Sequence, residues 1–216
     1  MGNGARVLWM SDAPFVSLMK RIEGRTLVDP FRCHILWQLV KATQNVPGDL
    51  AEVGVYKGGT ALLLAEAIPS WDQSKVHLFD TFSGMPSTAL PGVDIHKAGD
   101  FHDTSVKDVE AFLAGNQSGS ERFRIYPGFF PESANRSGLP DLLEFSFVHV
   151  DVDIYQSVLD CCKWFYPKLS KGGIMVFDDY GFPSCPGAKK AVDEYFVGKP
   201  SSPVYLPTGQ CVVMNL

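Results

Sequence analysis

The sequence has little positive charge and no long apolar run. Lysine and arginine number 19 against 24 aspartates and glutamates, which gives a formal net charge of −5. Proteins that bind nucleic acids need clustered basic residues to contact phosphates, so we expect no nucleic-acid partner. No apolar segment approaches the roughly 20 residues that a membrane-spanning helix requires, so we expect no membrane partner either.

Cysteine is also scarce. The five cysteines are Cys33, Cys161, Cys162, Cys185 and Cys211, an odd number without the paired spacing of a zinc site. We therefore predict reduced thiols and interpret Cys161-Cys162 as helix packing. The first residues also lack the basic, apolar and cleavage regions of a signal peptide, and we expect a cytoplasmic protein.

Short apolar segments alternate with helical patterns along the chain. Strands are expected at residues 50–53, 76–80, 123–126, 145–151, 173–177, 204–206 and 211–214. The main helices between them are expected to start near Pro30 and to cover 60–68, 106–113, 155–169 and 188–197. The alternation predicts an α/β fold with a doubly wound, mostly parallel, seven-stranded Rossmann-like sheet and an antiparallel C-terminal hairpin at its edge.

The length predicts one domain that covers residues 1–216. Within it, residues 1–45 form an N-terminal arm and a helix with several apolar side chains. These side chains would pack a lid over a site or a contact between copies in a homo-oligomer, and the sequence leaves both open.

Three carboxylates follow two of the predicted strands. Asp151 closes the run 145–150, and Asp178 and Asp179 close the run 173–177. The carboxyl ends of parallel strands meet at the edge where open α/β sheets bind ligands. Like charges at that edge repel one another unless a cation neutralises them, and oxygen ligands suit Mg²⁺. Asp153 lies near them, and we interpret it as the N-cap of the following helix, with metal binding as the alternative.

A glycine-rich turn follows the first strand. Glu52 ends this strand, glycines at 54, 58 and 59 follow, and Asp80 ends the next strand, where it could hold a ribose diol. The glycine spacing is not that of a dinucleotide site, and Glu52 would repel a diphosphate. S-adenosylmethionine carries a sulfonium and an ammonium group and no phosphate, so this pattern favours S-adenosylmethionine. Transfer of its methyl group to a hydroxyl would use a cation to stabilise the oxyanion, with Asp151 as the candidate base.

The segment from Ser83 to Asp103 holds three glycines and two prolines. A long loop of this kind is usually functional. His96 and His102 in this loop are candidates for contact with the acceptor, whereas His149 within a strand is interpreted as a core histidine.

Four segments together resemble the macrocin O-methyltransferase family. They are Glu52–Gly59, Asp80–Pro86, Asp151–Ser157 and Lys168–Gly173, the last followed by Asp178–Gly181. The resemblance implies a Mg²⁺-dependent methyltransferase that uses S-adenosylmethionine and acts on sugar hydroxyls of small natural products. It implies Mg²⁺ on Asp151, Asp178 and Asp179. It also implies a cofactor site that contains Glu52, Gly54, Tyr56, Gly58, Asp80 and Ser83, with Gly128 and Phe129 near the adenine.

Two positions depart from the family pattern. Val152 stands where the family has glycine, and Gln156 stands where it has glutamate. Two other functions stay open at this point: a methyltransferase that acts on a catechol or another phenol, and a cofactor-binding module without catalysis.

Overall fold

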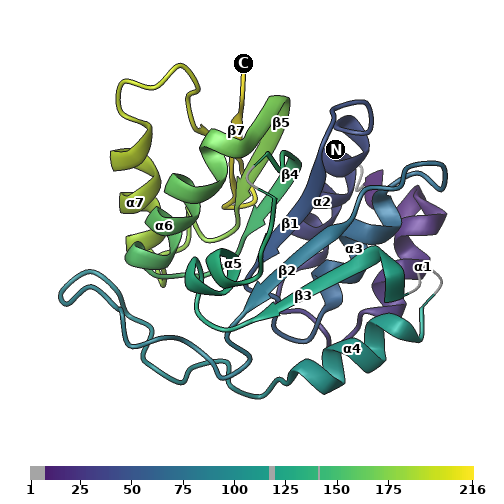
Figure 1. The fold of residues 1–216 in the computed structure, drawn as a ribbon, viewed down its shortest axis with the longest axis horizontal. Coiled ribbons are helices and arrows are strands. Elements are labelled where there is room, and N and C mark those ends of the chain that lie inside the picture. The colour runs from purple at the N-terminus through teal and green to yellow at the C-terminus, as the bar shows by residue number, and fades with distance from the viewer. Residues whose placement is uncertain (1–7, 117–119, 141) are drawn as a thin grey trace, which may run out of the picture.

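A computed structural model describes residues 8–116, 120–140 and 142–216 of the chain (Figure 1). A seven-stranded sheet runs through the molecule in the order β3-β2-β1-β4-β5-β7-β6. The strands are β1 (Asp49–Val53), β2 (Val76–Asp80), β3 (Phe123–Pro127), β4 (Phe145–Val150), β5 (Leu169–Phe177), β6 (Val204–Tyr205) and β7 (Cys211–Met214). The first five are parallel, while β7 pairs antiparallel with both β5 and β6. The predicted fold class is confirmed.

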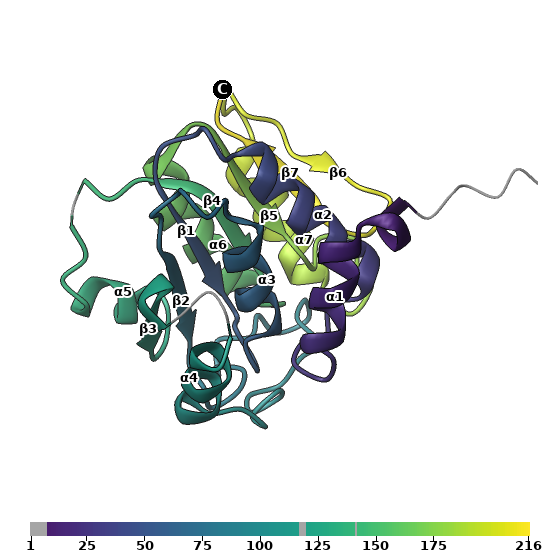
Figure 2. The same ribbon diagram turned by 90° about the vertical axis from the view of Figure 1, so that its right-hand side faces the viewer.

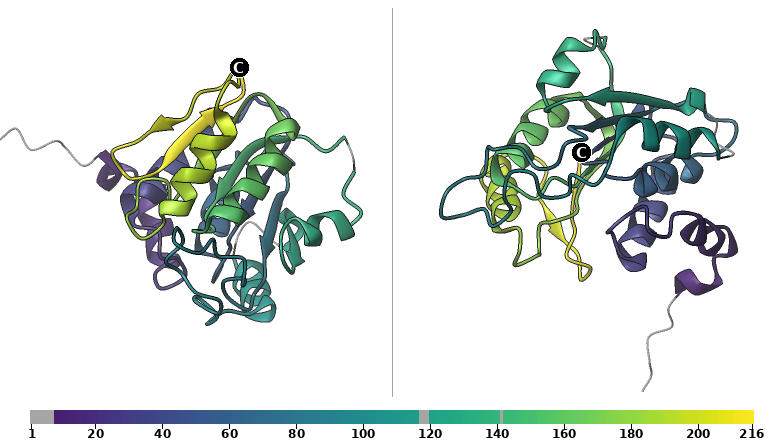
Figure 3. Two further views of the ribbon diagram at one scale, coloured as in Figure 1. Left: turned by 90° about the vertical axis from the view of Figure 1, so that its left-hand side faces the viewer. Right: turned by 90° about the horizontal axis from the view of Figure 1, so that it is seen from below.

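Helices cover both faces of the sheet. They are η1 (Leu8–Ser11), α1 (Ala13–Arg21), α2 (Pro30–Ala42), α3 (Gly59–Ala67), α4 (Val106–Ala114), η2 (Ser120–Arg122), α5 (Glu132–Arg136), α6 (Tyr155–Phe165), η3 (Tyr166–Lys168) and α7 (Pro186–Phe196). The helices α1 to α4 pack on one face, which Figure 2 turns toward the viewer. The helices α5 to α7 pack on the other face, seen at the left of Figure 3. No helix in the described part of the chain is long and apolar enough to cross a membrane.

Local sequence explains where several helices begin. The Asp29 side chain caps α2, because its Oδ1 accepts hydrogen bonds from the amides of Phe31 (2.9 Å) and Arg32 (3.2 Å). Pro30 occupies the first turn, where its missing N–H costs nothing. Ser105 caps α4 in the same way, by accepting from the amide of Asp108 at 3.2 Å. These caps fix the direction in which each helix leaves its loop.

The N-terminal helices are part of the core. Phe15 and Leu18 of α1 and Leu36 of α2 are fully or almost fully buried in the cluster beneath the sheet. Residues 1–7 of the predicted arm lie outside the described residues. That residues 1–216 form one domain, and that residues 1–45 act as a lid or a contact between copies, stay predictions.

Two sequence predictions about α6 are wrong. The helix ends at Phe165 and not at Leu169, because Tyr166–Lys168 tightens into a 3-10 turn around Pro167 and Leu169 already pairs with Phe145 in the sheet. Asp153 is not the N-cap of α6. Its backbone adopts the left-handed region at φ 58°, and the amide of Tyr155 donates instead to Asp94 Oδ1 at 3.0 Å.

The long loop between β2 and α4 crosses the edge of the sheet. In Figure 1 it extends from β2 beneath α6 and α7. Asp94 holds the loop at this position, because its carboxylate accepts a hydrogen bond from the amide of Tyr155 at the start of α6 and packs against Gly187 of α7. A Cβ on Gly187 would lie 1.8 Å from Asp94 Oδ1, so this approach requires glycine. The loop is thereby brought to the carboxyl ends of β4 and β5.

Candidate active site

A cavity of about 290 Å³ opens at the carboxyl ends of the parallel strands. This is the edge where open α/β sheets bind ligands. Seven of the predicted site residues line it: Gly54, Tyr56, Asp80, Gly128, Phe129, Asp151 and Asp179. Among the other predicted residues, Glu52, Gly58, Ser83 and Asp178 do not line this cavity in the described structure.

Gly54 lets the ends of β1 and β4 meet. Its φ is +87°, and a Cβ there would lie 1.8 Å from the carbonyl oxygen of Asp151. No other residue could keep both this conformation and this contact. The glycine turn and Asp151 therefore share one wall of the cavity.

Asp80 holds the glycine turn in place. Its Oδ2 accepts hydrogen bonds from the amides of Val55 (2.7 Å) and Tyr56 (2.9 Å), and its Oδ1 accepts from the amide of Phe82 at 2.7 Å. Because a carboxylate offers about four acceptor positions, roughly one remains for a ligand. Asp80 thus positions the backbone around the cavity and still faces it.

A buried chain of charged groups lies behind the cavity. Glu52 and His149 are both 0% exposed, and Glu52 Oε1 pairs with His149 Nδ1 at 2.9 Å. The other ring nitrogen faces Asp178 Oδ1 at 3.5 Å, so both ring nitrogens have a partner and the prediction of a core histidine is confirmed. Burial alone would lower the pKa of His149, but its hydrogen bonds with Asp178 and Glu52 raise that pKa to about 10. Both carboxylates therefore favour the protonated ring.

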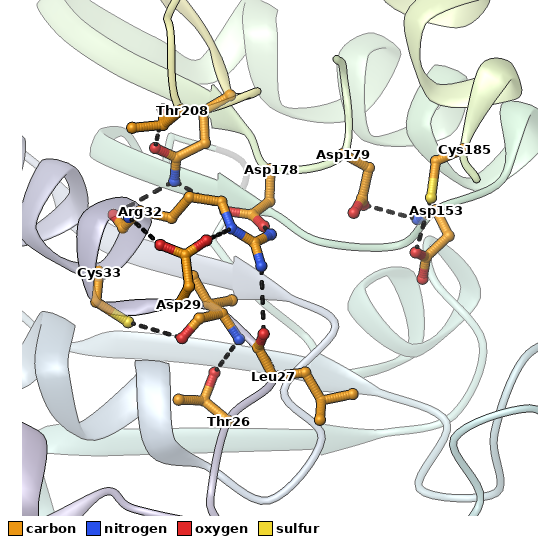
Figure 4. A network of polar contacts seen from close by, with 12 residues as sticks. Thr26, Leu27, Asp29, Arg32, Cys33, Asp153, Asp178, Asp179, Cys185 and Thr208 are labelled. Atoms are coloured by element: carbon orange, nitrogen blue, oxygen red, sulfur yellow. Dashed lines mark hydrogen bonds and ion pairs between the residues drawn. The ribbon is translucent and has the colours of Figure 1, made fainter. Parts of the chain in front are cut away.

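Arg32 of α2 completes this chain from the other side. Its guanidinium forms an ion pair with Asp178, and Gln210 Nε2 donates to Asp178 Oδ1 at 2.8 Å. Figure 4 shows Arg32 directed at Asp178. Burial would raise the pKa of Asp178, but His149 and Arg32 hold it below its ordinary value. Sequence reasoning missed Arg32, although its place beside Cys33 and one turn before Leu36 marks the buried face of α2.

The predicted metal ligands differ in their surroundings. One ligand atom each from His149, Asp151 and Asp178 lies within 4.8 Å of the other two. Asp179 turns away from Asp178, and its Oδ2 accepts from the amide of Asp153 at 3.0 Å (Figure 4). Asp151 makes no side-chain hydrogen bond or ion pair with the described residues. The three acids thus follow the ends of the neighbouring strands β4 and β5, and among the described residues Asp178 is the one of the three that pairs with positively charged side chains.

Crowding of negative charge shows in the pKa values of the two remaining acids. Burial and then the Asp178 charge raise the pKa of Asp151 well above its ordinary value. Burial, followed by the charges of Asp153 and Asp151, does the same to Asp179. Both carboxylates would gain from a further cation in the cavity.

The strand order and the cavity at the strand ends define the class of this protein as a Rossmann-like methyltransferase fold. It is similar to the solved O-methyltransferase NovP, with a TM-score of 0.73 and 26% sequence identity over 88% of this chain and 82% of that one. The calicheamicin methyltransferase CalS11 shares the fold at a TM-score of 0.72 and 17% identity, over 99% of this chain and 98% of the other.

The chain belongs to the macrocin-O-methyltransferase (TylF) family, whose profile matches residues 20–199. It is 31% identical over 159 residues to the demethyldecarbamoylnovobiocin O-methyltransferase of Streptomyces niveus, which covers 70% of this chain and 59% of that protein. It is 28% identical over 184 residues to the mycinamicin III 3''-O-methyltransferase of Micromonospora griseorubida, which covers 80% of this chain and 70% of that protein. The chain thus spans less than two thirds of the length of the first of these relatives.

Proposed function

We propose that this protein is a cytoplasmic enzyme that transfers a methyl group from S-adenosylmethionine to a hydroxyl of a sugar moiety on a small natural product. The observation that carries the proposal is one cavity that joins the Gly54 turn and Asp80 to Asp151 and Asp179. Membership of the macrocin-O-methyltransferase family supports the same reaction.

The cavity suits a cationic cofactor without phosphate. Its walls include Asp80, Asp151 and Asp179, which would repel a diphosphate and attract a sulfonium or an ammonium. Behind the cavity, Glu52 has a buried Oε2 that has no hydrogen-bond partner among the described residues. The turn at Gly54 and Tyr56 would contact the amino-acid and ribose part of the cofactor, and Gly128 and Phe129 would contact its adenine.

The donor set also fits Mg²⁺. Asp151 and Asp179 offer carboxylate oxygens that no lysine or arginine of the described chain pairs with, and Asp178 lies beside Asp151. Hard oxygen donors of this kind are those that Mg²⁺ prefers. When bound, the ion would stabilise the negative charge that develops on the acceptor oxygen. Arg32 supplies part of the compensating charge at Asp178.

Asp151 is the candidate base. Asp151 lines the cavity, and its carboxylate makes no hydrogen bond or ion pair with the described residues, so it is free to accept the proton of an acceptor hydroxyl. When bound, S-adenosylmethionine would supply the methyl group to the acceptor hydroxyl and would itself become a neutral thioether. Asp151 would accept the proton that the hydroxyl loses.

The experiment compares the wild type with Asp151→Asn and with the surface control Asp108→Asn. We expect Asp151→Asn to lose methyl transfer at least about 100-fold, the scale of general base catalysis, while calorimetry still detects S-adenosylmethionine binding. Removal of divalent ions with EDTA should stop turnover, and Mg²⁺ should restore it. Acceptors would include sugar diols and catechols, so that a preference for catechol contradicts the sugar assignment. Cofactor binding without turnover on any acceptor would contradict the enzyme assignment.

A further inference from the structure

A second set of donor atoms lies in the same cavity, away from Asp178. It consists of His96 from the long loop, Asp153 from the turn after β4, and Cys185 just before α7. His96 Nε2 lies 3.7 Å from Cys185 Sγ and 3.6 Å from Asp153 Oδ1, and Cys185 Sγ lies 3.2 Å from Asp153 Oδ1. Figure 4 shows Cys185 and Asp153 directed toward each other. Three donors of different kinds thus converge on one point.

The distances match those of a tetrahedral zinc centre. With metal–ligand bonds of about 2.0 to 2.3 Å at tetrahedral angles, neighbouring ligand atoms stand roughly 3.3 to 3.8 Å apart. The three separations in the structure run from 3.2 to 3.7 Å. A cation at the centre would need almost no movement of the side chains.

Two of the three donors, His96 and Asp153, are held by a neighbouring residue. Asp100 Oδ2 lies 3.4 Å from the other ring nitrogen of His96, the arrangement in which a carboxylate orients a metal-binding histidine. The amide of Asp153 donates to Asp179 at 3.0 Å, which fixes its left-handed backbone. The loop itself is fastened by Asp94, two residues before His96, to the start of α6.

Cys185 is poorly suited to act as a nucleophile. The contacts among Cys185, His96 and Asp100 resemble a thiol, a base and an orienting acid. Burial and the negative charges of Asp179 and Asp153, however, raise the pKa of the Cys185 thiol, which disfavours the thiolate. The same negative surroundings favour a bound cation. A divalent ion that prefers sulfur would displace the thiol proton to solvent and take its place.

We propose that His96, Asp153 and Cys185 form a second metal site, which binds Zn²⁺ or another divalent cation that prefers nitrogen and sulfur ligands. This site shares no residue with the proposed Mg²⁺ ligands Asp151, Asp178 and Asp179. Nitrogen and sulfur donors select Zn²⁺ over Mg²⁺, so the two ions need not compete for one place. All three side chains line the cavity, so the fourth position of the metal opens toward it.

The test uses Co²⁺ as a spectroscopic substitute for Zn²⁺. Metal-free protein is first saturated with Mg²⁺ to fill the oxygen site, and Co²⁺ is then added. We expect one Co²⁺ per chain, a near-ultraviolet thiolate-to-cobalt charge-transfer band, and loss of this band on addition of Zn²⁺. The readout does not require methyl transfer, so it stands or falls independently of the proposed function.

Two variants and a control assign the site. Cys185→Ser should abolish the band, while Cys33→Ser should keep it, because the Cys33 thiol is buried in the other core cluster and its hydrogen bond goes to the carbonyl of Val28 at 3.3 Å. His96→Ala, in a surface loop, should fold normally and weaken Zn²⁺ binding at least about tenfold. Absence of the band in the wild type, or its persistence in Cys185→Ser, would overturn the proposal. If Cys185→Ser does not fold, unchanged Zn²⁺ affinity in His96→Ala would do so.

Discussion

Replacement of Arg32 tests whether its ion pair with Asp178 stabilises the buried charges of this site. Its side chain is 12% exposed and pairs with the fully buried Asp178, while its guanidinium also stacks on the Phe182 ring at 4.7 Å. Arg32→Met keeps most of the apolar stem but removes the charge. Loss of one partner from a buried ion pair costs about 3–5 kcal/mol, because the other charge is left in a poorly solvated place.

The structure sets the expected size of the effect. Asp178 retains His149 and Gln210 as partners, so we expect a loss near the lower bound, about 3 kcal/mol. For a chain of this length each kcal/mol corresponds to about 2–4 °C in Tm. The Tm of Arg32→Met should therefore be roughly 6–12 °C below that of the wild type. The loss of stability in Arg32→Met should become smaller when Mg²⁺ is added, because the ion would supply positive charge beside Asp178 in place of the missing guanidinium.

A matched control lies on the surface. Arg25 also pairs with an aspartate, Asp108, and stacks on the Phe112 ring at 4.5 Å, but the two charged side chains are 30% and 49% exposed. Arg25→Met should cost less than about 1 kcal/mol and should not respond to Mg²⁺. The reasoning is refuted if both variants lose the same stability, or if Mg²⁺ raises the Tm of Arg32→Met no more than it raises that of the wild type.

Three further predictions concern the glycine turn after β1 and the first residue of β1. Asp80→Asn removes the charge of the side chain that accepts from the amides of Val55 and Tyr56. Calorimetry should show the affinity for S-adenosylmethionine reduced at least about tenfold, which corresponds to one hydrogen bond to a charged group. Unchanged affinity would contradict the role of Asp80 in shaping the cofactor site. Gly54→Ala should prevent normal folding, because its Cβ meets the carbonyl of Asp151, whereas Gly24→Ala, which has a similar φ of +71° but open space around it, should cost only about 1 kcal/mol in denaturant unfolding; equal costs would argue against the close contact. At Asp49, burial would raise the pKa of the carboxyl, but hydrogen bonds from His77 and the amide of Lys75 hold it below its ordinary value. Its stabilising contribution is therefore present above pH about 4 and is lost as the pH falls below that, so the difference in unfolding free energy between wild type and Asp49→Asn should shrink on acidification.

Much of the fold follows from patterns that are local in the sequence. Runs such as 145–150 and 173–177 are apolar enough to be buried on both faces, and the helical segments between them require parallel crossovers. The boundary at Leu169 was predicted wrongly because a tight turn at Pro167 and strand pairing with Phe145 outweigh an apolar pattern that would continue a helix.

The residue pattern is enough to predict that acids follow β4 and β5 and that glycine and Asp80 lie at the first turn, because strand ends in a parallel sheet must meet at one edge. The partners of those acids depend on how distant segments pack together. Arg32 lies 146 residues from Asp178, and His96 lies 89 residues from Cys185. Neither contact can therefore be predicted from a short sequence motif. Both depend on how α2 and the long loop pack against the finished sheet, which is a property of the folded chain and not of any segment within it.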